Sequence, residues 1–374
     1  MSEFQYVGFR AIDAPVSEKN LEFMRRQSSR AEVTGWTFDN DYHFGDFHGD
    51  SAEMLRRGYD FHFHYANFGV RTLMIRLPAG LPDAKAVEPY LDKDSLYVSK
   101  DKSGPGVVLC IKPCYEPDSL DEIWAPNEFF EDLLPLRAEI LSGDLRPFYL
   151  AHLGVIRDIN HSEEEHEGPV PAGLDRLTDA QAALASMFDL SAGLLAAAAR
   201  GAPPLPEDRG NSYDAWLQSR PVAVKDAWLS QLLADPRSRV RSEILAEYQK
   251  SRSAPSWPVL SLNRTLRELD TAGEELQQRI DRQKADAAAR ERAQKLARMK
   301  ADPQSTIKKT EELIKQRSGR IYSEIADMLA DLREALAGTA QAGLAEQQAR
   351  RLKEENPKRS GFTGELRRRG FVKK

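Results

Sequence analysis

The chain has 374 residues, more than one ordinary hydrophobic core accommodates, so two or three packed units are expected. Hydrophobic residues make up 41% and charged residues 30%, a balance that indicates a foldable, water-soluble protein and excludes a wholly disordered one. The formal net charge of −5 excludes a protein that is strongly basic as a whole.

The lack of a secretory signal pattern and the small number of cysteines favour a cytoplasmic location. The first residues, MSEFQYVGFR, lack the basic start and apolar run of a secretory signal. The most apolar window, Leu190–Ala199, is shorter than the roughly 20 residues that a membrane span needs, so no membrane association is expected. Cys110 and Cys114 are the only cysteines, which excludes a disulfide framework and a four-cysteine zinc site.

The N-terminal part alternates strand and helix patterns. Strands are predicted, in chain order, at residues 4–13, 32–38, 59–65, 70–77, 95–99 and 107–111. Short helices are predicted at residues 17–27, 51–58 and 84–91. Residues 39–41 begin a polar stretch that continues to Asp50, and the turn-forming residues 100–106 predict a hairpin between the last two strands. The fold class predicted is therefore α+β, with a mixed sheet packed by helices rather than a parallel array.

After Pro126 the pattern becomes helical, without a further strand signal. Helices are predicted at residues 127–142 with a kink near Pro135, then at 146–156, 178–187, 191–200, 212–219, 223–234 and 238–250. From Leu262 a coiled-coil pattern fades into a long charged helix that ends at Asp302–Pro303, and three more helices are predicted at 305–316, 321–336 and 340–355. The predicted domains are an α+β domain (1–160), a helical domain (161–255), the long charged helix (256–302) and a helical tail with a basic C-terminus (303–374).

Six segments carry a resemblance to known proteins: YVGFRAIDAP, YHFGDFHGD, YANFG, LPLR, GDLR and PVPAGL, which begin at residues 6, 42, 65, 134, 143 and 169. Together they resemble an uncharacterised family of bacterial cytoplasmic proteins. The resemblance covers most of the chain and implies no reaction, cofactor or catalytic residue. Residues 358–371 are loosely similar to the tails of SWIM zinc-finger proteins, although the SWIM metal ligands are absent.

A cluster of histidines and carboxylates is the best candidate for chemistry. His43, His48, His62 and His64 lie near Asp41, Asp46, Asp50 and Asp60, and such groups can hold a divalent ion or act as a general base. A strand over 59–65 puts His62 and His64 on one face. No HExxH or EF-hand spacing is present. His43, Asp46 and His62 are the candidate catalytic residues. The alternative is architectural: His43 and Asp46 organise a turn, while His62 and His64 line the polar face of a half-buried strand.

Two arginines form a candidate anion-binding site. Arg137 and Arg146 lie near Asp144 and Tyr149, and guanidinium groups match carboxylate or phosphate in a bidentate manner. The alternative, which we favour, is a structural ion pair that closes the helix turn.

The C-terminal segment 356–374 has seven basic residues against the single acid Glu365. The basic residues are Lys358, Arg359, Arg367, Arg368, Arg369, Lys373 and Lys374. Such a patch attracts phosphate backbones or acidic proteins. Most basic tails are instead solvated or paired with acids of the same protein.

Because no complete catalytic motif is present, the sequence favours a non-catalytic interaction or regulatory protein that acts through protein–protein contacts, with an unidentified protein partner. The alternatives are a metal-assisted hydrolase that uses His43, Asp46 and His62, and nucleic-acid association through the basic tail. No cofactor is expected, and whether the protein is an enzyme stays open.

Overall fold

The computed structural model describes residues 3–78, 83–100, 106–117, 119–205, 213–235, 240–251, 257–316 and 318–372. The chain forms two compact units, residues 1–278 and 279–374. The long helix α12 (Leu266–Ala301) begins in the first unit and ends in the second. The first unit includes both the residues of the predicted α+β domain and those of the predicted helical domain.

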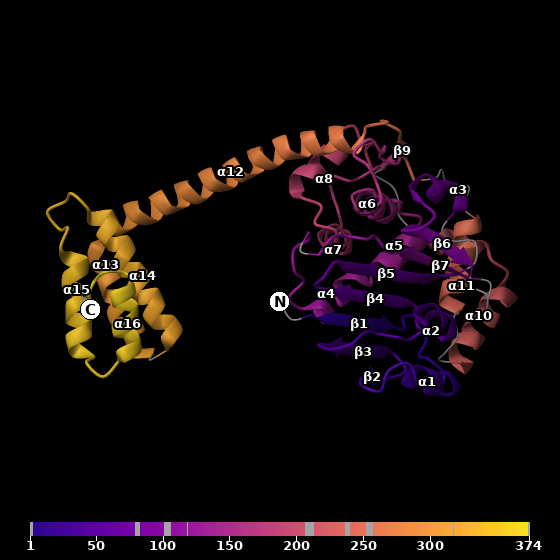
Figure 1. The fold of residues 1–374 in the computed structure, drawn as a ribbon, viewed down its shortest axis with the longest axis horizontal. Helices are drawn as coiled ribbons and strands as arrows, with labels where there is room; N and C mark the ends of the chain where they lie inside the picture. Colours follow the sequence, from indigo (N-terminus) through magenta and orange to yellow (C-terminus); the bar gives the residue numbers. More distant parts are fainter. Residues whose placement is uncertain are drawn as a thin grey trace. The chain divides into compact units, whose positions relative to one another are not determined.

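A seven-stranded antiparallel sheet forms the centre of the first unit, with the strand order β2-β3-β1-β4-β5-β7-β6 (Figure 1). Its strands are β1 (Gln5–Arg10), β2 (Glu32–Val33), β3 (Thr37–Tyr42), β4 (Phe61–Ala66), β5 (Val70–Leu77), β6 (Leu96–Lys100) and β7 (Val107–Ile111). The α+β class is confirmed. The predicted mixed sheet is wrong, because all strand pairs of this sheet are antiparallel. Strand β1 lies between β3 and β4, and this pairing depends on contacts between segments that are distant in the sequence.

One strand boundary differs from the prediction. Asp39, Asn40 and Asp41 lie inside β3, not in a polar loop after it. Alternation explains the difference, because Phe38 and Tyr42 of β3 are buried on one face of the strand while Asp39 and Asp41 line a pocket on the other. The predicted hairpin pairs β6 with β7, but residues 101–105 of its turn lie outside the described residues.

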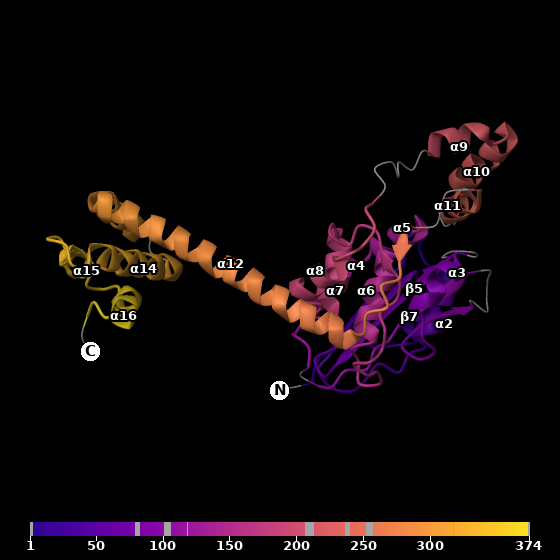
Figure 2. The ribbon, with the colours of Figure 1, turned by 90° about the horizontal axis from the view of Figure 1, so that it is seen from above.

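Helices cover the sheet face that carries Tyr6, Phe61 and Phe63, and Figure 2 shows α4, α6, α7 and α8 on this side. The helices are α4 (Pro126–Leu133), α5 (Leu136–Leu141), α6 (Arg146–Val155), α7 (Asp179–Met187) and α8 (Ala192–Ala199). The predicted kink at Pro135 is the break between α4 and α5. The same hydrophobic core includes Phe148 and Leu184, which fall on opposite sides of the predicted boundary at residue 160.

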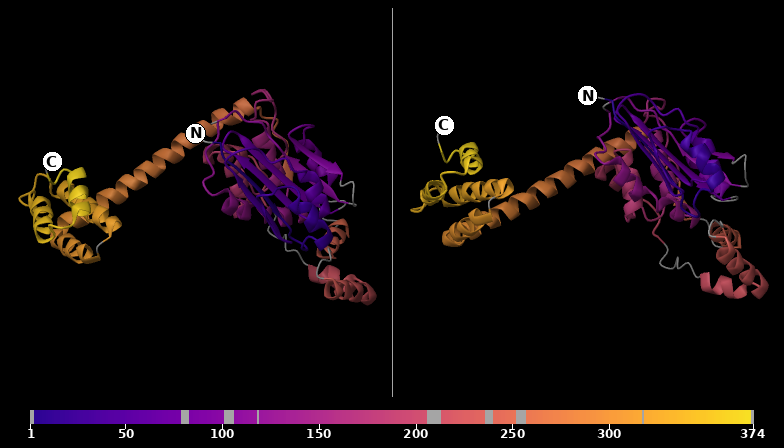
Figure 3. Two further views of the ribbon diagram at one scale, coloured as in Figure 1. Left: turned by 60° about the horizontal axis from the view of Figure 1, so that its bottom comes forward. Right: turned by 90° about the horizontal axis from the view of Figure 1, so that it is seen from below.

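The opposite sheet face carries a smaller core around Phe9, Phe38 and Tyr59. Two short helices, α1 (Glu18–Arg25) and α2 (Ser51–Arg57), contribute Leu21 and Met54 to it. The strands lie side by side in the left view of Figure 3. A further short helix, α3 (Ala84–Val87), continues into the 3₁₀ helix η1 (Glu88–Tyr90).

The helical part of the first unit contains a small strand pair that the sequence did not predict. Strands β8 (Val170–Pro171) and β9 (Val259–Leu260) pair antiparallel. Two-residue strands are too short to show the period-2 pattern, so sequence periodicity could not reveal them.

The N-terminal part of helix α12 packs closely against α8, and the two helices cross at Gly193 of α8 and Gly273 of α12. A β-carbon at Gly193 of α8 would overlap backbone atoms of Gly273 and Gln277 in α12, and the Gly193 amide donates to Gln277 Oε1 (2.8 Å). Close approach of the two helix backbones thus requires glycine at this crossing.

Replacing Gly193 by Ala should therefore lower the free energy of unfolding of the first unit by about 1–3 kcal/mol, the usual effect of overpacking. Thermal and urea unfolding followed by circular dichroism measure it. Gly364→Ala is the matched control, because nothing lies within 4 Å of the β-carbon position there, and the better helix propensity of alanine should stabilise by up to about 1 kcal/mol. Equal effects of the two substitutions would contradict the tight crossing.

Three further helices follow α8: α9 (Tyr213–Ser219), α10 (Val222–Ala234) and α11 (Val240–Ser251). Trp216 of α9 stacks on Trp228 of α10, with ring centroids 5.7 Å apart, and contacts Tyr248 of α11. Helices α9 and α10 lie side by side in Figure 2. The Arg241 guanidinium of α11 lies 3.9 Å from Asp13, which connects this group to the sheet.

The second unit is a helical bundle. After the last part of α12 it contains α13 (Pro303–Leu313), the 3₁₀ helix η2 (Ile314–Gln316), α14 (Gly319–Leu336), α15 (Leu344–Glu355) and α16 (Ser360–Arg368). Ile325, Leu329, Leu352, Phe362 and Leu366 form its main core. The predicted break at Asp302–Pro303 is confirmed, and Asp302 caps α13.

Helix α16 was not predicted. Its apolar contacts rest on Phe362 and Leu366, which are both buried, and two residues are too few to give a clear periodic pattern in a basic segment.

Among the described residues, no single helix has both the length and the apolar character to cross a bilayer. Helices α7 and α8 pass that test only as a pair, and they are bent by 116° relative to each other.

Candidate functional site

Of the two histidines of β4, His62 is buried in the sheet and His64 is half-buried. As predicted, His62 and His64 share a face, with ring centroids 6.4 Å apart. His62 Nδ1 donates to the Gly8 carbonyl oxygen (3.1 Å), and its ring stacks on Phe9 at 4.2 Å. Burial, with a contribution from His64, lowers the pKa of His62 to about 3. His62 therefore stays neutral near pH 7 and packs as an apolar ring.

The other two candidates of the histidine cluster lie apart from His62. His43 is exposed, and its ring contacts Phe4 at 5.4 Å. Asp46 Oδ1 accepts from Gln5 Nε2 (2.6 Å), and His64 Nε2 donates to Gln5 Oε1 (2.9 Å), so Gln5 links Asp46 to His64 rather than to His62. In the part of the chain that the structure describes, no three His, Cys, Asp or Glu side chains are arranged to hold a metal ion.

The two arginines proposed for anion binding are buried and engaged by carboxylates of the same chain. Arg137 of α5 donates to Asp13 Oδ1 (3.1 Å) and Oδ2 (2.6 Å) and to the Arg76 carbonyl oxygen (2.9 Å). Arg146 of α6 donates to both Asp144 oxygens (2.6–3.1 Å). Both guanidinium groups are thus engaged by carboxylates within the chain, as the alternative of a structural ion pair expects, and their donors are not available to an anion.

The basic tail is largely folded into the second unit. Arg369 donates to Asp327 Oδ1 and Glu365 Oε2, each at 2.6 Å, and Arg368 donates to Glu365 Oε1 (2.6 Å). Arg359 donates to the Ile314 carbonyl oxygen. Lys358 and Arg367 lie in the same segment, whereas Lys373 and Lys374 fall outside the described residues. Arg368 and Arg369 thus pair with acids of their own unit.

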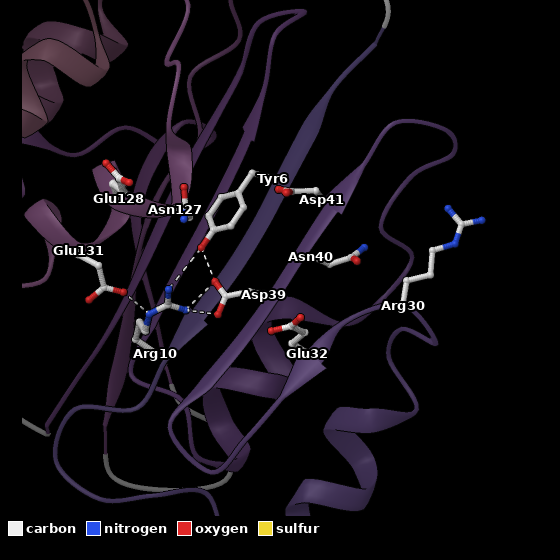
Figure 4. A pocket seen from close by; sticks show the side chains of 10 residues that line it. All are labelled: Tyr6, Arg10, Arg30, Glu32, Asp39, Asn40, Asp41, Asn127, Glu128 and Glu131. Carbon is white, nitrogen blue, oxygen red and sulfur yellow. Dashed lines mark hydrogen bonds and ion pairs between the residues drawn. The ribbon is translucent and has the colours of Figure 1, made fainter. Parts of the chain in front are cut away.

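A pocket of about 570 Å³ lies on the helix-covered side of the sheet, over β1 and β3 and beside α4 (Figure 4). Its lining residues are Tyr6, Arg10, Arg30, Glu32, Asp39, Asn40, Asp41, Asn127, Glu128 and Glu131. Gly8 lets α4 approach the sheet here, because a β-carbon at this position would overlap the ring of Phe130. The pocket remains open because β3 and β2 extend beyond the helix.

A network around Arg10 forms the inner wall of this pocket (Figure 4). Arg10 Nη1 donates to both oxygens of Asp39 (2.9 Å each), and Arg10 Nε donates to Glu131 Oε1 (2.6 Å). The Tyr6 hydroxyl donates to Asp39 Oδ1 (2.5 Å). Burial, followed by the negative charge of Asp39, raises the pKa of Tyr6, so it remains a phenol that donates a hydrogen bond. The network joins β1, β3 and α4 and fixes the pocket's shape.

Sequence reasoning named only Asp41 of this pocket, as a neighbour of the histidines. A signal was present, because Tyr6 and Arg10 in one strand and Asp39 and Asp41 in another follow period-2 spacing. It was missed because residues 39–41 were assigned to a loop, and Glu131 is 121 residues from Arg10.

A second surface is formed by α10, whose described side chains include none that is buried. Four of its large apolar side chains are exposed: Val222 (67%), Leu229 (57%), Leu232 (42%) and Leu233 (87%). Trp228, which is half-buried, stacks on Trp216 of α9 instead. We call Val222, Leu229, Leu232 and Leu233 the α10 surface. Exposed apolar clusters of this kind are typical of protein-binding sites.

Comparison of the chain with protein-family models, with curated proteins and with solved structures gives no match, so the site is interpreted from its own geometry.

Proposed function

We propose that this protein is a non-catalytic interaction protein that assembles through the α10 surface. The observation that carries the proposal is an apolar helix with one face against α9 and the other open to water. Leu229 and Leu233 lie on adjacent turns of the outer face of α10, and their side chains are 57% and 87% exposed. Water contact of this much apolar surface is unfavourable by about 25 cal/mol per Å², so burial against a partner is favoured.

The partner that best fits this surface is a second copy of the chain. The only charged residues of α10 are Lys225 and Asp226, both near its N-terminal end. If two α10 helices pack antiparallel through their α10 surfaces, with the register centred at position 228, these charges lie opposite Ser230 and Gln231, so no like charges meet. An isologous contact of this kind buries apolar surface on both copies at once.

Light scattering coupled to size-exclusion chromatography tests the proposal. The wild-type chain should elute at twice its 42.1 kDa mass. The double substitution Leu229→Glu and Leu233→Glu should give a monomer, because it places two carboxylates in each half of the contact. Since each leucine contributes about 1.5–3 kcal/mol when buried, the dissociation constant should rise by roughly two orders of magnitude or more.

The matched control is Ile159→Glu with Trp124→Glu. These residues are 57% and 87% exposed, the same fractions as Leu229 and Leu233, but they lie outside α10. The control should leave the dimer intact. A wild-type monomer at micromolar concentration, or equal loss of the dimer in both double variants, would overturn assembly through α10.

A metal-assisted hydrolase at the histidine cluster and nucleic-acid association through the tail remain predictions. No specific contact among the described residues favours either over the α10 surface.

A further inference from the structure

Charge is distributed unevenly between the two units of the chain. Residues 279–374 contain 24 Lys and Arg against 14 Asp and Glu, whereas residues 1–278 contain 29 against 44. The second unit therefore has a net charge of +10 and the first unit −15, although the whole chain has only −5. A polyanion is attracted to the second unit and repelled by the first, so the second unit is where such a partner binds.

Half of the positive excess comes from the C-terminal part of α12. Between residues 279 and 300 there are eight basic residues and three acidic ones. Every residue from 281 to 295 is exposed. Arg279, Arg282, Arg290 and Arg298 are exposed and make no side-chain hydrogen bond or ion pair with another described residue. Their guanidinium groups are therefore available to a ligand.

Helical spacing places these four arginines on the side of α12 that faces away from the core of its unit. Met299 marks the core side, because it is buried among the apolar residues of the second unit. With 3.6 residues per turn, Arg279 and Arg290 point within about 20° of the opposite direction, and Arg282 and Arg298 flank them by roughly 80° on either side. We call these four residues the α12 basic face. Asp286 is the acid that lies between them.

A groove of about 600 Å³ lies along the same part of α12. Among the described residues, its charged lining consists of Arg292, Lys295, Arg298 and Glu291. Arg292 pairs with Glu334 and Lys295 with Asp331, each at 2.6 Å, but the two basic side chains are 56% and 54% exposed. Exposed ion pairs contribute little free energy, so a phosphate group can replace these carboxylates at low cost.

The rest of the second unit's surface indicates which kind of polyanion fits. No large hydrophobic side chain is exposed among its described residues, which disfavours an apolar protein interface or a membrane surface. Its aromatic residues, Tyr322, Phe362 and Phe371, are buried or half-buried, so the bases of a single strand find no exposed ring on which to stack. A duplex needs neither feature, because its phosphates lie on the outside and arginine binds phosphate in a bidentate manner.

We propose that the α12 basic face and the adjoining groove bind the phosphate backbone of duplex nucleic acid, irrespective of base sequence. The free arginines replace counterions along the backbone, and this exchange supplies the affinity. The α10 surface belongs to the first unit, so the inference does not depend on assembly through it. It also differs from association through the tail, where Arg368 and Arg369 are engaged by acids.

Fluorescence anisotropy with the full-length chain and a labelled DNA duplex of mixed sequence tests this proposal. The wild type should bind saturably at low salt. The triple variant Arg282→Gln, Arg290→Gln and Arg298→Gln should lower the affinity at least about tenfold, and it should flatten the dependence of log K on log salt by about 0.9 for each lost contact. Glutamine keeps a high helix propensity at these exposed positions, so circular dichroism should show an unchanged fold.

The matched control is Lys19→Gln with Lys85→Gln and Lys93→Gln, at three exposed positions of the first unit. It removes the same total charge and should leave the affinity within about twofold of wild type, because salt screens charges that lie outside the contact. A duplex of different base sequence should also bind within about twofold, since phosphate contacts carry no sequence information.

Absence of saturable binding to the duplex at low salt would overturn the proposal. Equal weakening by the two triple variants would also overturn it, since the attraction would then be one of total charge. Unchanged binding by the α12 variant would place the interaction elsewhere, for example in the tail. Tighter binding of poly-glutamate than of the duplex would replace nucleic acid by an acidic protein as the partner.

Discussion

Replacing Arg137 by Met should lower the free energy of unfolding of the first unit by about 3–5 kcal/mol. The Arg137 and Asp13 side chains are 3% and 0% exposed, and their atoms approach to 2.6 Å. Removing the guanidinium leaves a buried carboxylate without its main counter-charge, and it also removes the bond from α5 to the Arg76 carbonyl oxygen of β5. Chemical unfolding followed by tryptophan fluorescence measures the change.

Two comparisons separate this effect from a general loss of charge. Arg351→Met breaks exposed pairs with Glu311 and Glu355, in which Arg351 is 57% exposed, and should reduce stability far less than Arg137→Met does. The double variant Arg137→Met with Asp13→Asn should lose less stability than the sum of the single changes, because no uncompensated charge remains. Additive losses would show that the two residues stabilise the fold independently.

Acidification should destabilise the first unit through His62. The ordinary pKa of histidine is about 6.5, whereas burial lowers the pKa of His62 to about 3. Between these values the unfolded chain binds a proton that the folded chain does not, so stability falls as pH falls. The loss from His62 alone should reach about 2–3 kcal/mol at pH 4.5. His64, whose pKa burial lowers to about 4, adds to it in the same direction.

His62→Asn tests this prediction, because an asparagine amide can still donate to the Gly8 carbonyl oxygen but does not titrate. The variant should be less stable at neutral pH and should show a flatter dependence of unfolding free energy on pH between 7 and 4.5. His43→Asn, at an exposed position, should keep the wild-type slope. If His62→Asn and wild type have the same slope, His62 is not the group that resists protonation.

Most elements of the fold could be predicted from local patterns. The alternation in residues 59–65 predicted a strand with His62 and His64 on one face, and β4 has that geometry. Turn residues predicted the pairing of β6 with β7, and Pro135 predicted the break between α4 and α5. These features depend on neighbours in the chain, so sequence spacing was sufficient.

The candidate sites could not be predicted in the same way. The pocket joins β1, β3 and α4, and the bond from Arg10 to Glu131 spans 121 residues. The α10 surface was equally hidden, because the pattern of Val222–Ala234 predicts a helix but not which of its apolar side chains stay exposed. Exposure is decided by what packs against a helix, which is a property of the tertiary structure.

The amino-acid sequence by itself determined the α+β class, most helix and strand positions and the break at Asp302–Pro303, because periodicity, capping and proline act over a few residues. Tertiary structure alone decided that the sheet is antiparallel, that Arg137 pairs with Asp13 of a distant segment, and that His62 is buried. It also decided which arginines of α12 stay unpaired and where exposed leucines gather. These outcomes depend on contacts between distant segments, which no local pattern specifies.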